Sequence, residues 1–166
     1  MSAADQLRSI TPEGYERLRA QLAELTTVRR SEVARWLRDA RDGAGGLEDN
    51  LDHAEALEEH ALLEHRIATL RHTLALVEII AYAADGTIGI GAHVRLRMPS
   101  GDTIGYQLVG RFEADPSRHR ISIESPVGQA ILGRRPGDLV DVHAPGGTHR
   151  IEILEIRAPT TRALAA

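Results

Sequence analysis

The sequence contains no cysteine and no long apolar run, and each absence excludes a class of protein. Without cysteine the chain has no disulfide framework, no thiolate metal ligand and no thiol nucleophile. No apolar run approaches the roughly 20 residues that cross a bilayer, and the first residues lack the basic and apolar segments of a signal peptide. We therefore expect a cytoplasmic protein that does not contact membranes.

The sequence has enough hydrophobic residues for a packed core, and its charged residues are distributed unevenly along the chain. Of 166 residues, 42% are hydrophobic, and the formal net charge is −4. Residues 39–64 hold nine acidic side chains and one basic one, Arg41. Binding to nucleic-acid phosphates needs neutralising cations, so this segment does not bind them by itself. It is either a solvated face or a place that meets a divalent cation supplied elsewhere.

The first half of the chain has the pattern of two helices joined by glycines. Thr11 and Pro12 suit the cap and the first position of a helix, and residues 43–46 include three glycines that interrupt it. Apolar residues recur along the first helix at spacings of three and four, less regularly after the fourth: Tyr15, Leu18, Leu22, Leu25, Val28, Val33, Trp36 and Leu37.

The second helix is predicted over residues 47–82, and its apolar residues follow a heptad spacing. They are Leu63, Ile67, Leu70, Leu74 and Val77. Heptad spacing is typical of helices that pair, so residues 1–82 should form an antiparallel coiled-coil hairpin. About 30 residues of helix make an arm on the order of 45 Å long, with the glycines and the acidic residues at its tip.

From residue 83 the hydrophobic period changes to two, which predicts a small β domain. We expect strands near 90–98, 103–109, 119–124, 139–143 and 149–156, and a short helix over 126–133. The predicted fold class is α+β, with a mostly antiparallel sheet. The expected organisation is a hairpin over 1–82, a globular domain over 83–157 and a loose tail over 158–166.

The sequence shows no catalytic machinery of its own. There is no Gly-x-Ser-x-Gly elbow, and the glycines at 86–91 precede a strand instead of opening a helix. The acidic tip is the remaining candidate, because Asp42 comes just before the glycines and Glu48 and Asp49 just after them. Oxygen ligands with open coordination positions suit Mg²⁺. The alternative is that these acids only complement the dipole of the second helix.

Several segments in order resemble the Gre transcript cleavage factors of bacterial RNA polymerase, over about residues 9–156. The resembling segments are Ile10-Thr11-Pro12-Glu13-Gly14-Tyr15, Leu47-x-x-Asn50, Arg66-Ile67, Tyr106-x-Leu108-Val109-Gly110, Glu113-Ala114-Asp115, Ser125-Pro126-Val127 and Pro145-Gly146-Gly147. The resemblance implies a coiled-coil hairpin followed by a domain similar in fold to FK506-binding proteins. It also implies a monomeric cofactor of the polymerase, and not an enzyme.

The resemblance further implies how the parts are used. The globular domain would dock on RNA polymerase through Ser125, Pro126 and Val127, although Ser125 and Pro126 also suit a simple helix cap. The hairpin would enter the secondary channel, where tip acids share the active-centre Mg²⁺ only in the complex. Five arginines of the first helix would contact nascent RNA or the channel walls, or pair with acids of the second helix: Arg29, Arg30, Arg35, Arg38 and Arg41.

The tip departs from the family pattern. The family usually reads Gly-Asp-Leu-x-Glu-Asn, whereas this chain reads Gly45-Gly46-Leu47-Glu48-Asp49-Asn50. Asp49 stands at the Glu position and is expected to be the main metal ligand, with Asp42 or Glu48 as a second. Two functions therefore stay open: stimulation of RNA cleavage, and occupation of the channel that inhibits or modulates transcription without cleavage.

Overall fold

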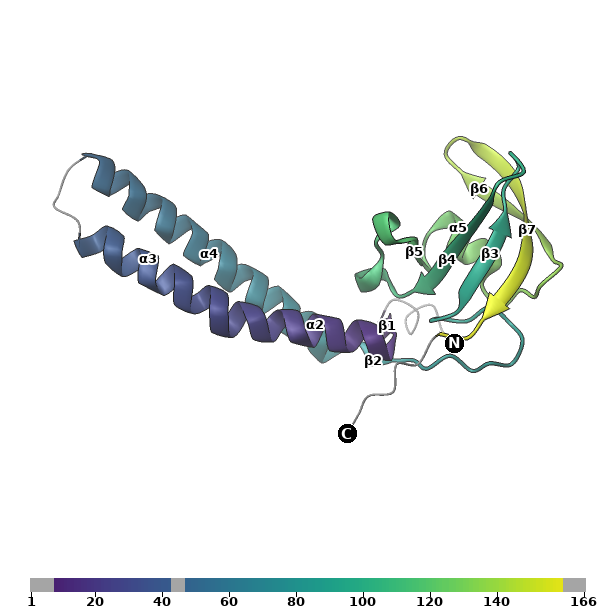
Figure 1. Cartoon of the computed structure of the whole chain (residues 1–166), viewed down its shortest axis with the longest axis horizontal. Helices are drawn as coiled ribbons and strands as arrows, with labels where there is room; N and C mark the ends of the chain where they lie inside the picture. Colours follow the sequence, from purple (N-terminus) through teal and green to yellow (C-terminus); the bar gives the residue numbers. More distant parts are fainter. Residues whose placement is uncertain (1–7, 43–46, 160–166) are drawn as a thin grey trace. The chain divides into compact units, whose positions relative to one another are not determined.

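A computed structural model describes residues 8–42 and 47–159, and the chain in it divides into two compact units (Figure 1). One unit is Tyr15–Leu76, and the other combines Met1–Gly14 with Val77–Ala166. Residues 77–82, which the sequence assigns to the hairpin, thus group with the globular unit. The predicted α+β class is confirmed.

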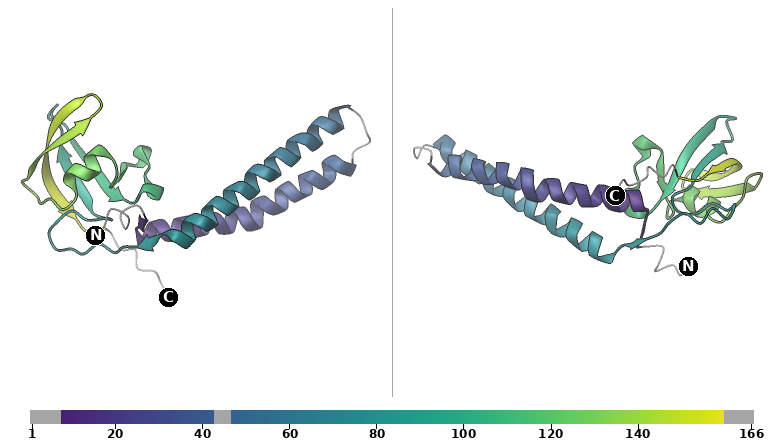
Figure 2. Two further views of the ribbon diagram at one scale, coloured as in Figure 1. Left: turned by 180° about the vertical axis from the view of Figure 1, so that it is seen from behind. Right: turned by 60° about the horizontal axis from the view of Figure 1, so that its bottom comes forward.

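The Tyr15–Leu76 unit is a pair of antiparallel helices (Figures 1 and 2). The first arm consists of α2 (Pro12–Glu24), the π-helix η1 (Leu25–Arg29) and α3 (Arg30–Asp42), and the second is α4 (Leu47–Leu76). Its buried seam contains Leu25, Val33, Leu63 and Ile67, with Leu22, Leu37 and Leu70 packed against it. The predicted coiled coil is therefore present, held together by apolar side chains from both arms.

The second helix ends at Leu76 and does not reach Tyr82 as predicted. Glu78–Ile79 forms the short strand β2, which pairs in parallel with β1 (Ser9–Ile10). Backbone hydrogen bonds support this pairing from the N–H of Glu78 to the carbonyl of Arg8 and from the N–H of Ile80 to the carbonyl of Ile10. β-Branched residues at 77–80 favour this extended pairing over a further helical turn.

The globular unit is built on a five-stranded sheet with the order β5-β4-β3-β7-β6. Its strands are β3 (His93–Arg97), β4 (Thr103–Val109), β5 (Arg120–Ser122), β6 (Leu139–Ala144) and β7 (Gly147–Arg157). The sheet is mixed, because β4 and β5 pair in parallel while the other neighbours are antiparallel. The five strands predicted from the alternating pattern all exist: β4 has the predicted ends, and the ends of the other four differ.

One face of this sheet carries the core. Along β3 the burial alternates, with Val94 and Leu96 inside and the residues between them exposed. The helix α5 (Pro126–Ile131) contributes Ile131 to the same core. Two short 3-10 helices, η2 (Arg111–Glu113) and η3 (Pro116–Arg118), link β4 to β5. Within the residues that the structure describes, no helix is long and apolar enough to cross a membrane.

Candidate functional site

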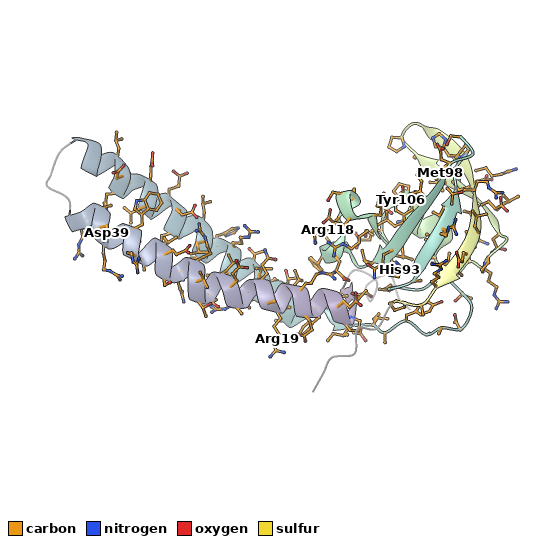
Figure 3. The ribbon with its side chains drawn as sticks, in the orientation of Figure 1. Arg19, Asp39, His93, Met98, Tyr106 and Arg118 are labelled. Atoms are coloured by element: carbon orange, nitrogen blue, oxygen red, sulfur yellow. The ribbon has the colours of Figure 1, made fainter. Side chains whose placement is uncertain are left out.

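The predicted tip lies where the two arms of the hairpin are joined. Asp42 is the last residue of α3, and Glu48 and Asp49 belong to the first turn of α4. Residues 43–46 and the side chains of these three acids lie outside the described residues, so their mutual distances stay a prediction. Asp39 and Asp52, the nearest described acids on each arm, are both exposed (Asp39 is labelled in Figure 3).

Of the five arginines predicted to contact RNA or the channel, Arg29 and Arg30 are engaged by described acids. Arg30 donates two hydrogen bonds of 2.7 Å to the carboxylate of Glu64 on α4. These bonds lower the pKa of Glu64. Arg29 bonds Glu32 at 2.7 Å and Glu59 of α4 at 3.1 Å. The structure thus gives Arg29 and Arg30 the pairing with the second helix that the sequence left open.

Arg35 and Arg38 differ from that pair. Both are exposed on α3, and neither has an ion pair with any residue that the structure describes. Arg41 lies one turn further on and has an interaction of its own. Of the five predicted contacts, Arg35 and Arg38 are therefore the guanidinium groups that are available to a partner in the described arm.

The predicted docking segment forms the start of α5. The Ser125 hydroxyl accepts a hydrogen bond of 3.0 Å from the N–H of Gly128 and donates one of 2.7 Å to the carbonyl of Ser122. Pro126 is exposed, whereas Val127 is half-buried and packs against the sheet core. Ser125 is therefore a helix cap, and the exposed side chains of this segment are Pro126 and Gln129, three positions apart on one face of α5.

No metal site of the usual kind exists in the described part of the chain. Groups of three or more His, Asp or Glu that could hold an ion are absent among residues 8–42 and 47–159 whose side chains are described. His60 and Glu64 lie four positions apart on α4, a spacing that could place two metal ligands on one face. His60 is half-buried, and the Glu64 carboxylate is bound by Arg30.

Two family models cover nearly all of this architecture. The model described as "Transcription elongation factor, N-terminal" matches residues 8–79, and "Transcription elongation factor, GreA/GreB, C-term" matches residues 83–158. Transcription elongation factor GreA of Thermoanaerobacter pseudethanolicus is 40% identical over 151 residues, which are 89% of this chain and 96% of that protein. The chain belongs to the GreA/GreB family.

Other GreA/GreB proteins are similar over the same length. GreA of Chloroflexus aurantiacus is 38% identical over 151 residues, 89% of this chain and 96% of its own. GreA factor homolog 1 of Thermus thermophilus, whose crystal structure is known, is 31% identical in sequence. The match to that structure has a TM-score of 0.41 and covers 90% of this chain and 98% of that one. GreA/GreB factors are cofactors of bacterial RNA polymerase and not enzymes, so the lack of a catalytic constellation in the sequence agrees with the family.

One feature of this GreA/GreB chain was missed in the sequence. Glu113 of the Glu-Ala-Asp segment is buried and contacts the start of the first helix, about a hundred positions earlier in the chain. An acidic residue among turn signals gives no sign of burial, so nothing in the local pattern separates Glu113 from a surface acid.

Proposed function

We propose that this GreA/GreB factor docks on bacterial RNA polymerase through its globular unit and stimulates the polymerase's cleavage of backtracked RNA through the hairpin tip. The observation that carries the proposal is the seam-packed hairpin, which holds Asp42 and Asp49 at the ends of two long helices. The 30-residue helix α4 corresponds to about 45 Å of rigid arm. Such an arm can deliver a carboxylate into a narrow channel.

The residue types of the tip suit a Mg²⁺ ion shared with the polymerase. Asp42, Glu48 and Asp49 carry carboxylates, and hard cations such as Mg²⁺ prefer oxygen ligands. When bound, the cation activates water and stabilises the charge that develops on the phosphate. The chain's own part is to bring Asp49, with Asp42 or Glu48, to the open coordination positions and to keep them there.

The sequence of the tip favours weaker stimulation than a standard family member gives. Gly46 stands at the usual Asp position, and Asp49 is one methylene shorter than the usual Glu. One carboxylate attracts and orients the cation less than two do. The same observation supports the second candidate, a factor that occupies the channel and modulates transcription without cleavage.

Contact with the extruded RNA is assigned to Arg35 and Arg38. Their exposed guanidinium groups lie on the arm just before the acidic tip and are not engaged by described acids. Guanidinium groups bind phosphate with two parallel hydrogen bonds and stack on bases. A photoreactive RNA 3′ end in a backtracked complex should crosslink to this stretch and not to Arg29 or Arg30.

The experiment that tests the function is cleavage in a backtracked elongation complex, with Asp49→Asn beside wild type. Asp52→Asn is the matched control, because Asp52 is an exposed acid of the same helix. We expect wild type to increase the rate of RNA cleavage. The increase should be at least about tenfold smaller with Asp49→Asn, and it should be nearly that of wild type with Asp52→Asn. Wild type that slows extension and never cleaves would establish the second candidate.

A further inference from the structure

Glu113 is a charged side chain in the interior of the globular unit. Its residue is 5% exposed, and its carboxylate faces the first residues of α2. Oε2 accepts a hydrogen bond of 2.8 Å from the N–H of Thr11, and Oε1 accepts one of 2.5 Å from the Thr11 hydroxyl. The N–H of Gly110 lies 3.4 Å from Oε2. A buried carboxylate is retained only where such donors replace water.

These bonds complete the cap of the hairpin's first helix. The Thr11 hydroxyl accepts a hydrogen bond of 2.9 Å from the N–H of Gly14 while it donates to Glu113. Thr11 is thus an N-cap whose hydroxyl is oriented by a side chain 102 positions away. The negative charge of Glu113 also lies at the positive end of the α2 dipole. Residues 11–14 and Glu113 belong to the same compact unit.

Two glycines make room for this contact. A Cβ on Gly14 would lie 1.9 Å from Oε1 of Glu113, and a Cβ on Gly110 would lie 1.9 Å from the carbonyl oxygen of Ser9. Glycine inside a helix is less favourable than alanine, so a glycine at position 14 needs a compensating contact. The missing side chain of Gly14 leaves room for the Glu113 carboxylate beside α2, and that of Gly110 leaves room for the backbone of Ser9 in β1.

We propose that Glu113 is a positioning residue that couples the hairpin to the polymerase-docking unit. Only the first turn of α2 belongs to the globular unit, and the helix continues unbroken from Gly14 into the hairpin. Glu113 binds Thr11 at the start of that turn, so loss of this carboxylate should loosen the first turn of the helix that continues into the arm. The proposal rests on the proposed function, because it concerns delivery of the tip.

The decisive comparison is between binding and efficacy. Glu113→Ala should leave the affinity for RNA polymerase within about threefold of wild type, because the proposed docking residues Pro126 and Gln129 lie on α5 and are not changed by this substitution. Cleavage at saturating factor should fall at least about tenfold, because a tip that is not held in place spends less time at the active centre. Glu155→Ala is the matched control: this glutamate of the same unit bonds only Arg95 and Arg157 in the structure's described part, and its loss should change neither quantity.

Conservative rescue and a double mutant separate positioning from simple loss of stability. Glu113→Gln keeps an oxygen for the Thr11 N–H and offers an N–H to the Thr11 hydroxyl, so it should restore most of the cleavage. Gly14→Ala should act like Glu113→Ala, because its methyl group collides with the carboxylate. In the Glu113→Ala background the collision is gone, and Gly14→Ala should then cause no further loss.

A polymerase-free readout keeps this inference apart from the proposed function. Hydrogen exchange of the α2 backbone should be at least about tenfold faster in Glu113→Ala than in wild type, and unchanged in Glu155→Ala. If wild type never cleaves but exchange behaves as stated, the cleavage function fails and the coupling stands. If wild type cleaves, equal loss of binding and cleavage in Glu113→Ala, or unchanged cleavage at saturation, would overturn the coupling. Unchanged exchange in Glu113→Ala would overturn it in either case.

Discussion

Asp115 illustrates how a single carboxylate organises the link between β4 and β5. Its Oδ1 accepts a hydrogen bond from the Ser117 hydroxyl, and its Oδ2 accepts one of 3.1 Å from Arg120. The backbones of Asp115 and Arg120 also form two hydrogen bonds of 3.0 Å. The Ser117 bond, followed by the Arg120 guanidinium, lowers the pKa of Asp115. The fold therefore favours the ionised carboxylate.

The first prediction is an acid-dependent stability that disappears in Asp115→Asn. A lowered pKa in the folded state stabilises the fold above the unfolded pKa of about 4, and the gain is lost as the pH falls through the lower folded value. Wild type should therefore exceed Asp115→Asn in resistance to urea from neutral pH down to about 4, and the difference should shrink below it. The difference in stability between wild type and Asp115→Asn is measured by hydrogen exchange of residues 103–122 at a series of pH values. A constant difference down to strong acid would contradict the assignment, and Asp39→Asn on α3 serves as control.

At the scale of elements, the apolar patterns predicted the helices and strands well, and their ends less well. The heptad in α4 and the alternation in β3 reflect burial on one side, which a sequence displays directly. The end of α4 depends on the pairing of β2 with β1, a contact between positions about 70 residues apart that no local window contains. The burial of Glu113 escaped detection for the same reason.

The π-helix η1 explains why the first arm's apolar pattern becomes irregular. A π turn contains one extra residue and rotates the helix on its C-terminal side, so Leu25 and Val33 both reach the seam while Val28 is 51% exposed. The hydroxyl of Thr26 bonds the carbonyl of Leu22, and that of Thr27 bonds the carbonyl of Ala23. Such bonds from a threonine hydroxyl to the carbonyl of the preceding turn often accompany local bending of a helix.

The second prediction is that the hairpin tolerates deletion of Thr26. The shortened segment can form an ordinary α-helix with the same seam on both sides, so the free energy of unfolding should change by less than about 1 kcal/mol. Deletion of Arg35, the matched control, rotates Leu37 by about 100° relative to Val33. Leu37 then leaves its place against the seam, which should cost about 2 kcal/mol or more. Trp36 is the chain's one tryptophan, so its fluorescence reports on hairpin unfolding. Equal losses in both deletions would show that the π turn is not an inserted residue.

At the scale of the whole molecule, the proposed function assigns docking and tip chemistry to different units, so the two should be separable by mutation. Val127 packs against the core, so a charge placed there would disturb the fold as well as docking. Gln129 is exposed on α5, and Gln129→Glu changes the surface without touching the core. The two variants Gln129→Glu and Asp49→Asn thus address one unit each.

The last prediction is that these variants fail in opposite ways. Gln129→Glu should raise the dissociation constant for polymerase by about tenfold or more and regain wild-type cleavage at saturation, because its tip is intact. Asp49→Asn should bind as tightly as wild type but cleave poorly, and should therefore inhibit wild type when the two are mixed on one backtracked complex. Inhibition must follow the ratio of the two proteins, since both occupy the same docking surface. Asp49→Asn could bind polymerase by itself and still fail to inhibit wild type in the mixture. That result would contradict the prediction, because it would mean that binding through the unit that carries α5 does not place the hairpin at the polymerase site where cleavage occurs.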